Sequence, residues 1–149
     1  MQKQLSKKDI KEINQKLKEL YNLDNYFDKK DKLILEDNLI KKENNTIFFY
    51  LDNQIMPHLK TLLQNNFLPK VIIDMPAVKF ITSGADVMRP GIKQTDEFQK
   101  DAIIVIVDET HKKPLAIGKS MFSSEEIKQM GKGKVIKNLH YVGDEIWNS

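Results

Sequence analysis

Basic side chains beside glycine are the part of this chain best suited to bind a phosphate group. Lys119, Lys132 and Lys134 each follow a glycine, whose backbone can come close to a ligand. Seven lysines and only two acids lie between residues 111 and 140. This local excess of positive charge attracts anions. The alternative is a solvated lysine surface without a ligand, because the whole chain has a net charge of only +3.

Arg89 is the one arginine among 24 basic residues. Its planar guanidinium can hold a phosphate through two parallel hydrogen bonds, or it can clamp a carboxylate such as Asp86 or Asp96 and stiffen its loop. Both interpretations stay open on the sequence. The Pro90–Gly91 pair that follows predicts a type II turn, because proline presets φ and glycine accepts a positive φ.

The segment before Arg89 is rich in β-branched and aromatic residues over positions 71–81. Alternation around Lys79 predicts an extended strand that turns this lysine away from the core, toward either a ligand or plain solvent. Three small residues, Ser83, Gly84 and Ala85, then predict a tight loop. A loop of this composition can bring backbone amides close to a ligand, or it can simply let the chain cross a barrel mouth.

Motifs of catalysis are missing from the chain. It has no cysteine, which excludes disulfides, thiolate catalysis and cysteine-ligated metals. The histidines at positions 58, 111 and 140 lack the spacing of metal ligands. No P-loop occurs, and Gly84 and Gly91 lie too far apart for a dinucleotide-binding motif. We therefore expect a protein that is not an enzyme and needs no metal or other cofactor.

The first 68 residues predict a small α+β domain, and Pro69 is the expected boundary. Its expected elements are a helix to about Tyr21 opened by a Ser6–Asp9 capping box, a hairpin around Asp37–Asn38, a strand over residues 46–51, and a second helix opened by Met56–Pro57.

Residues 69–149 predict a mixed β domain. Apolar runs over 102–107, 114–119 and 135–142 have the composition of buried strands. Ser123 and Glu126 form a second capping box, which predicts a short helix that ends before Gly131. Several short strands with one or two helices in under 80 residues are typical of a small barrel.

A resemblance to a known family is carried by the strings VIIDMPAVKFITSGADVMRPGI, LAIGKS and GKGKVIKNLHYVGDEIW. Together they resemble the PUA domain, a small RNA-binding β-barrel, as found in the malignant-T-cell-amplified-sequence-1 and ligatin-like translation proteins. FFYLDNQIMPHLKTLLQNNFLPKV resembles the end of that family's pre-PUA domain. The resemblance implies an archaeal-type homologue with an α+β pre-PUA domain over residues 1–68 and a PUA-type mixed β pseudo-barrel with short helices over 69–149.

The resemblance also implies a function in translation. Such a protein binds RNA, either the small ribosomal subunit or the acceptor end of tRNA, during initiation, reinitiation or recycling. A protein with a SUI1-type domain is an expected partner of the N-terminal domain. We expect a cytoplasmic protein without a membrane partner, since no apolar run is long enough to span a bilayer. The expected RNA-binding residues are Lys79, Ser83, Gly84, Ala85, Arg89, Lys119, Lys132 and Lys134.

Two other functions stay open on the sequence. The chain could be the RNA-binding accessory of a separate enzyme that modifies tRNA or rRNA. It could also be an adaptor between proteins whose barrel no longer binds RNA. Pro76 favours the adaptor, because PUA sequences usually carry a glycine there, and proline lacks the backbone N–H that glycine offers.

Overall fold

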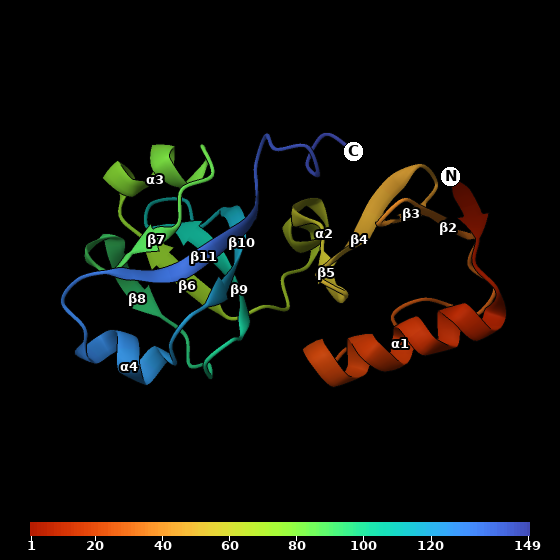
Figure 1. Ribbon diagram of the computed structural model, residues 1–149, viewed down its shortest axis with the longest axis horizontal. Helices are drawn as coiled ribbons and strands as arrows, with labels where there is room; N and C mark the ends of the chain where they lie inside the picture. The colour runs from red at the N-terminus through yellow and green to blue at the C-terminus, as the bar shows by residue number, and fades with distance from the viewer. The chain divides into compact units, whose positions relative to one another are not determined.

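The computed structural model describes residues 1–149, which form two compact units. The first unit contains Met1–Thr61 together with Ser149, and the second contains Leu62–Asn148. Each unit has a sheet of its own (Figure 1). No helix is long and apolar enough to cross a lipid bilayer.

The first unit is built on five antiparallel strands that pair in chain order. Its hairpin turns match their residues: Glu43–Asn44 and Asp52–Asn53 take positive φ at both positions, as two-residue type I′ turns require. The hairpin predicted around Asp37–Asn38 is present. The strands are β1 (Gln2–Gln4), β2 (Leu33–Glu36), β3 (Leu39–Lys42), β4 (Asn45–Leu51) and β5 (Gln54–Pro57).

Helix α1 (Lys7–Tyr21) begins with the predicted capping box. The Ser6 hydroxyl accepts a hydrogen bond from the Asp9 N–H at 3.1 Å, and the Asp9 carboxylate accepts one from the Ser6 N–H at 2.9 Å. Its apolar face is buried at helical spacing by Ile10, Ile13 and Leu17.

The second predicted helix begins later than the sequence suggested. Met56 and Pro57 belong to β5, and helix α2 spans Leu59–Gln64. Pro57 ends an edge strand, where its missing N–H costs no ladder hydrogen bond. Proline at the end of an edge strand and proline in the first turn of a helix give the same local signal. His58 opens the helix instead, since its Nδ1 accepts a hydrogen bond from the Lys60 N–H at 3.0 Å.

The second unit contains a six-stranded sheet in the order β7-β11-β10-β9-β6-β8. Strands β6 and β9 pair in parallel, and the other neighbours are antiparallel. Two short helices lie on opposite sides of these strands in Figure 1. The predicted class, an α+β unit followed by a mixed β unit with short helices, is confirmed. The elements are β6 (Lys70–Ile73), α3 (Met75–Ile81), β7 (Val87–Met88), the 3-10 turn η1 (Arg89–Gly91), β8 (Ile92–Thr95), β9 (Ile103–Asp108), β10 (Pro114–Ser120), α4 (Ser124–Gln129) and β11 (Lys134–Tyr141).

Helix α3 lies where the sequence predicted a strand. Its N-cap is Asp74, whose carboxylate accepts a hydrogen bond from the Ala77 N–H at 2.9 Å. Pro76 occupies the first turn, where a helix leaves backbone N–H groups free in any case. The strand prediction was wrong because it gave more weight to the β-branched composition of the segment than to the helix-start signals at Asp74 and Pro76. Lys79 and Phe80 lie side by side on an exposed helix surface rather than on opposite faces of a strand.

The predicted type II turn at Pro90–Gly91 is also wrong. Arg89–Gly91 forms a single 3-10 turn, and Gly91 is not among the residues with positive φ. A Cβ at Gly91 would lie 3.3 Å from the Ala77 Cβ. The glycine therefore serves close packing against α3 rather than an unusual backbone angle.

Gly118 is required by strand packing. A Cβ at this position would lie 2.5 Å from Ile136 Cγ2 and 2.9 Å from the Lys137 carbonyl oxygen, beside the bulge in β10. We expect Gly118→Ala to lower the free energy of unfolding by about 1–3 kcal/mol through overpacking. Gly131→Ala is the matched control, since nothing lies within 4 Å of its Cβ position. Urea unfolding checks this, and equal midpoints for the two variants would contradict it.

Candidate functional site

A groove of about 470 Å³ opens beside α3 in the second unit. One wall is α3, and the other is the segment 85–91 with Lys134 of β11. Its lining is apolar apart from Asp86 and Lys134. Phe80 is 58% exposed and Met88 is 50% exposed, so both present apolar surface to solvent at this groove. An apolar recess with such side chains at its edge is a candidate site for a ligand or partner.

The loop between α3 and β7 is held by Asn138 of β11. The Asn138 side-chain amide donates to the carbonyls of Ile81 and Ala85, both at 3.0 Å. Its backbone N–H donates to the Asp86 carboxylate at 2.8 Å. Gly84 takes φ +97°, and a Cβ there would lie 3.1 Å from the Tyr141 ring. The loop is therefore fixed in shape before any ligand arrives.

An ion pair lies at the mouth of the groove. Lys134 Nζ is 3.0 Å from the Asp86 carboxylate. Burial of Asp86 opposes its ionisation, but the Asn138 N–H and the Lys134 ammonium outweigh this, so the pKa of Asp86 lies below its ordinary value. Asp86 is therefore ionised at neutral pH and compensates much of the charge of Lys134.

Five of the residues predicted to bind RNA lie at this end of the unit. Ala85 and Lys134 line the groove itself. Lys79 is exposed on α3, with its Nζ 5.2 Å from the centre of the Phe80 ring. Ser83 lies just beyond the end of α3, and its hydroxyl donates to the Lys79 carbonyl at 2.8 Å. Gly84 follows it in the loop described above.

Arg89 points to neither of its predicted carboxylate partners. Its Nε donates to the Ile127 carbonyl at 2.7 Å, and its Nη1 donates to the Ile92 carbonyl at 3.3 Å. Asp86 is paired with Lys134, and Asp96 accepts a hydrogen bond from a backbone N–H at 2.8 Å. Arg89 thus joins α4 to the start of β8, and its charge is not neutralised by an acid.

The structure does not bring Lys119 and Lys132 to the groove. Lys119 lies within β10, directly opposite Lys137 of β11. Lys132 is exposed in the turn before β11. Gly118, the glycine before Lys119, is required for strand packing. Its position next to a lysine therefore does not indicate a phosphate-binding site.

Phe80 and Met88 were missed by the prediction from sequence. A strand over residues 71–81 would have made Phe80 a core residue. The signal that could have exposed it was the helix start at Asp74 and Pro76, which sets a different periodicity for the residues that follow.

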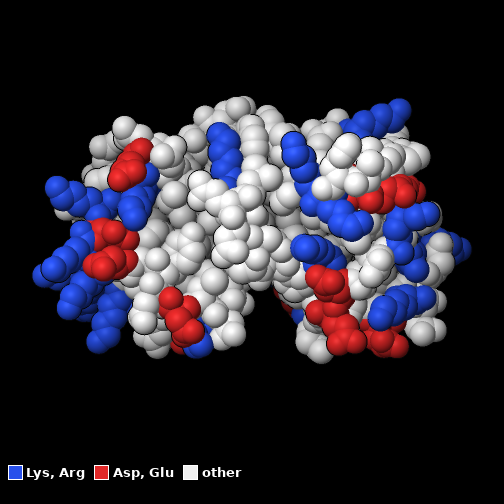
Figure 2. Space-filling view, turned by 180° about the vertical axis from the view of Figure 1, so that it is seen from behind, with Lys and Arg blue, Asp and Glu red and all other residues white.

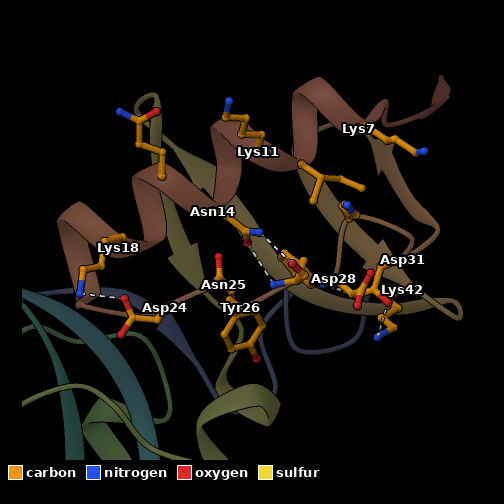
Figure 3. A pocket seen from close by; sticks show the side chains of 14 residues that line it. Lys7, Lys11, Asn14, Lys18, Asp24, Asn25, Tyr26, Asp28, Asp31 and Lys42 are labelled. Atoms are coloured by element: carbon orange, nitrogen blue, oxygen red, sulfur yellow. Dashed lines mark hydrogen bonds and ion pairs between the residues drawn. The ribbon is translucent and has the colours of Figure 1, made fainter.

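The first unit contains a larger cleft of about 940 Å³ along α1, which we call the α1 cleft. Figure 3 shows two of its lysines paired with aspartates. Lys18 pairs with Asp24 at 2.9 Å, and Lys42 pairs with Asp31 at 3.3 Å. The α1 cleft therefore has a mixed charge that is compensated in part. No group of three His, Asp or Glu side chains in the chain is placed to hold a metal ion.

Charge over the surface is mixed as well. On the face drawn in Figure 2, Lys and Arg side chains adjoin Asp and Glu side chains in several places. Any electrostatic contribution to RNA binding must therefore come from local groups of unpaired cations.

His140 is a buried residue near the end of β11. It precedes Tyr141, whose ring lies against Gly84 in the loop between α3 and β7. The His140 ring is fully buried, and its Nδ1 lies 2.9 Å from the Asp144 carboxylate. Asp144 also accepts hydrogen bonds from the backbone N–H groups of Tyr141 and Trp147 at 2.9 and 2.7 Å. Burial lowers the pKa of His140 below its ordinary value, although the Asp144 carboxylate acts in the opposite direction.

Comparison with known proteins points to one family. The family model for the PUA domain matches residues 69–142. An uncharacterized protein of Methanocaldococcus jannaschii is 42% identical over 97% of this chain and 93% of its own length. Translation machinery-associated protein 20 of Saccharomyces cerevisiae is 35% identical over 74% of this chain and 65% of its own length. Malignant T-cell-amplified sequence 1 of Rattus norvegicus is 31% identical over 70% of this chain and 62% of its own length. The chain thus spans less than two thirds of these last two proteins.

Solved structures agree with this result. A hypothetical protein from Pyrococcus horikoshii has a TM-score of 0.84 and 30% identity, over 99% of this chain and 98% of that one. A chain of an H/ACA RNP bound to a substrate RNA has a TM-score of 0.52 and 28% identity, over 64% of this chain and 29% of that one.

The buried His140 makes stability depend on pH. The unfolded chain protonates this histidine near its ordinary value of about 6.5, whereas the folded chain resists protonation to lower pH. The unfolded state therefore binds more protons in this range. We expect the free energy of unfolding to be constant above about pH 6.5 and to fall as the pH drops below it.

Urea unfolding between pH 5 and 8 measures this dependence. A His140→Gln variant should be less stable at every pH. Its free energy of unfolding should no longer show the pH dependence that comes from His140. Both proteins should keep the pH dependence that comes from their carboxylates. An NMR titration of the His140 ring gives its pKa directly. A value above 6.5 would contradict the prediction.

Proposed function

The chain belongs to the PUA-domain family that includes translation machinery-associated protein 20, and on this premise we propose that it binds RNA as part of the translation machinery. We place the boundary between its pre-PUA and PUA domains at Pro69, where the match to the family model begins. A role in translation is consistent with a cytoplasmic protein.

The observation that carries this proposal is the apolar groove with Phe80 and Met88 exposed at its edge. Proteins that recognise single-stranded RNA stack unpaired bases on aromatic side chains, which tolerates different base identities. A volume of about 470 Å³ is in the range of sites for small ligands, and the fixed loop keeps the entropy cost of binding low.

Basic groups near the groove would contact the phosphates of such an RNA. Lys79 lies on the exposed surface of α3, and Lys134 lies in the groove wall. We therefore assign RNA contacts to Lys79, Ser83, Ala85 and Lys134, with Gly84 shaping the loop between them. An RNA phosphate would compete with Asp86 for Lys134. Lys134 therefore contributes less to the affinity for RNA than a lysine without a carboxylate partner would.

We assign the groove to an unpaired RNA end, and we propose that this RNA is the acceptor end of tRNA or belongs to the small ribosomal subunit. A SUI1-type protein is the proposed partner of the N-terminal unit. We propose a role in binding rather than catalysis, which the largely apolar lining of the groove supports. The likeness to a chain of an H/ACA RNP supports a second candidate function, an accessory of RNA modification.

Binding to tRNA, to tRNA without its terminal CCA, and to small ribosomal subunits separates these functions. We expect salt-dependent fluorescence anisotropy changes with intact tRNA and a weaker affinity on trimming. Binding to the subunit selects the translation role. Failure to bind any of the three would contradict RNA binding.

The groove itself is tested by Phe80→Ala. Removal of base stacking worth about 1–3 kcal/mol should weaken RNA binding about five- to 150-fold. Because Phe80 is largely exposed, the fold should remain intact. Met121→Ala, another exposed apolar side chain of the same unit but outside the groove, is the control and should bind like the parent protein.

A further inference from the structure

A smaller hollow of about 290 Å³ lies on the other side of the 3-10 turn η1 from the groove. Its lining includes the basic residues Arg89, Lys93 and Lys128 and contains no carboxylate. The α1 cleft and the groove both contain acidic residues, so this hollow differs from them in having a lining without any acid. We call it the cationic hollow.

The three cations of the cationic hollow are uncompensated. Arg89 donates only to two backbone carbonyls, which accept two of its N–H groups without cancelling its charge. Lys93 and Lys128 are exposed and form no ion pair within the chain. Arg89 has five N–H donors and uses two, so part of its guanidinium remains free to donate to an anion.

Three cations without a carboxylate partner border this one recess. Arg89 supplies N–H donors in a planar fork, and Lys93 and Lys128 supply ammonium groups. This combination favours an anion with several acceptor oxygens, which is the chemistry of a phosphate group.

The groove and the cationic hollow share the η1 turn as a wall. Met88 and Gly91 line the groove, whereas Arg89 and Ile92 line the cationic hollow. Neighbouring residues along the chain thus face the two sites alternately, which places the sites next to each other. A strand of RNA whose end occupies the groove would cross this turn on leaving it.

We propose that the cationic hollow binds a backbone phosphate of the same RNA whose unpaired base occupies the groove. This inference rests on the proposed function and adds a second binding point to it. The phosphate fixes the direction in which the strand leaves the groove and supplies most of the salt dependence, while the groove supplies the stacking interaction.

The test is a double variant, Lys93→Gln with Lys128→Gln, measured by fluorescence anisotropy with the RNA that the parent protein binds. Arg89 is kept, because its hydrogen bonds join α4 to β8. Lys112→Gln with Lys113→Gln removes the same charge from another exposed part of the same unit and is the matched control.

We expect the affinity of the double variant to fall at least about tenfold at low salt, with a smaller slope of log affinity against log salt. The slope should fall by up to about 0.7, because the hollow binds one phosphate and each neutralised phosphate of single-stranded RNA contributes about 0.7 to the slope. The control should keep both the affinity and the slope of the parent protein.

Equal behaviour of the double variant and its control would overturn the inference and leave RNA binding in the groove intact. A parent protein that binds no RNA would instead overturn the proposed function. Isothermal titration with inorganic phosphate or with a poly-glutamate peptide distinguishes other occupants. Suppose that the parent protein binds phosphate or the peptide and that the double variant binds neither. If the double variant nevertheless keeps the RNA affinity of the parent protein, the hollow binds another anion. The proposal that it binds an RNA phosphate is then refuted.

Discussion

Asn138 is the residue on which the groove depends. From the middle of β11 it holds the end of α3 and the following loop through two carbonyls, and its backbone N–H fixes Asp86. Without these hydrogen bonds, the loop that contains Gly84, a residue with positive φ, would have many conformations. The groove would then lack a defined wall on this side. The same strand brings Lys134 to the groove and the Tyr141 ring against Gly84. One strand thus sets both the shape and the charge of the candidate site.

Pairing of charges separates the groove from the cationic hollow. Lys134 in the groove has a carboxylate partner, so its attraction for an anion is reduced. Around η1 the cations are unpaired, because Arg89 donates its hydrogen bonds to carbonyls. A net charge of +3 therefore conceals a local group of unpaired cations that composition alone does not indicate.

Much of the fold could be predicted from the sequence, and the errors have two physical causes. Capping boxes such as Ser6–Asp9, the hairpins and the long apolar strands depend on neighbouring residues, so local patterns found them. Helix α3, and with it the exposed Phe80, was missed because its local start signals at Asp74 and Pro76 were given less weight than the β-branched composition. The turn at Gly91 and the partners of Arg89 were missed because contacts with residues distant in sequence decide them.

The most direct test of the central claim, that the groove beside α3 receives an unpaired RNA end, is an NMR titration of the isotope-labelled protein with a short single-stranded RNA ending in CCA. The account predicts shifts of the backbone amides of Phe80, Ala85, Met88 and Lys134, with no change for residues such as Lys11 along the α1 cleft. Shifts confined to the α1 cleft, or a groove that stays unperturbed while the RNA binds, would contradict it.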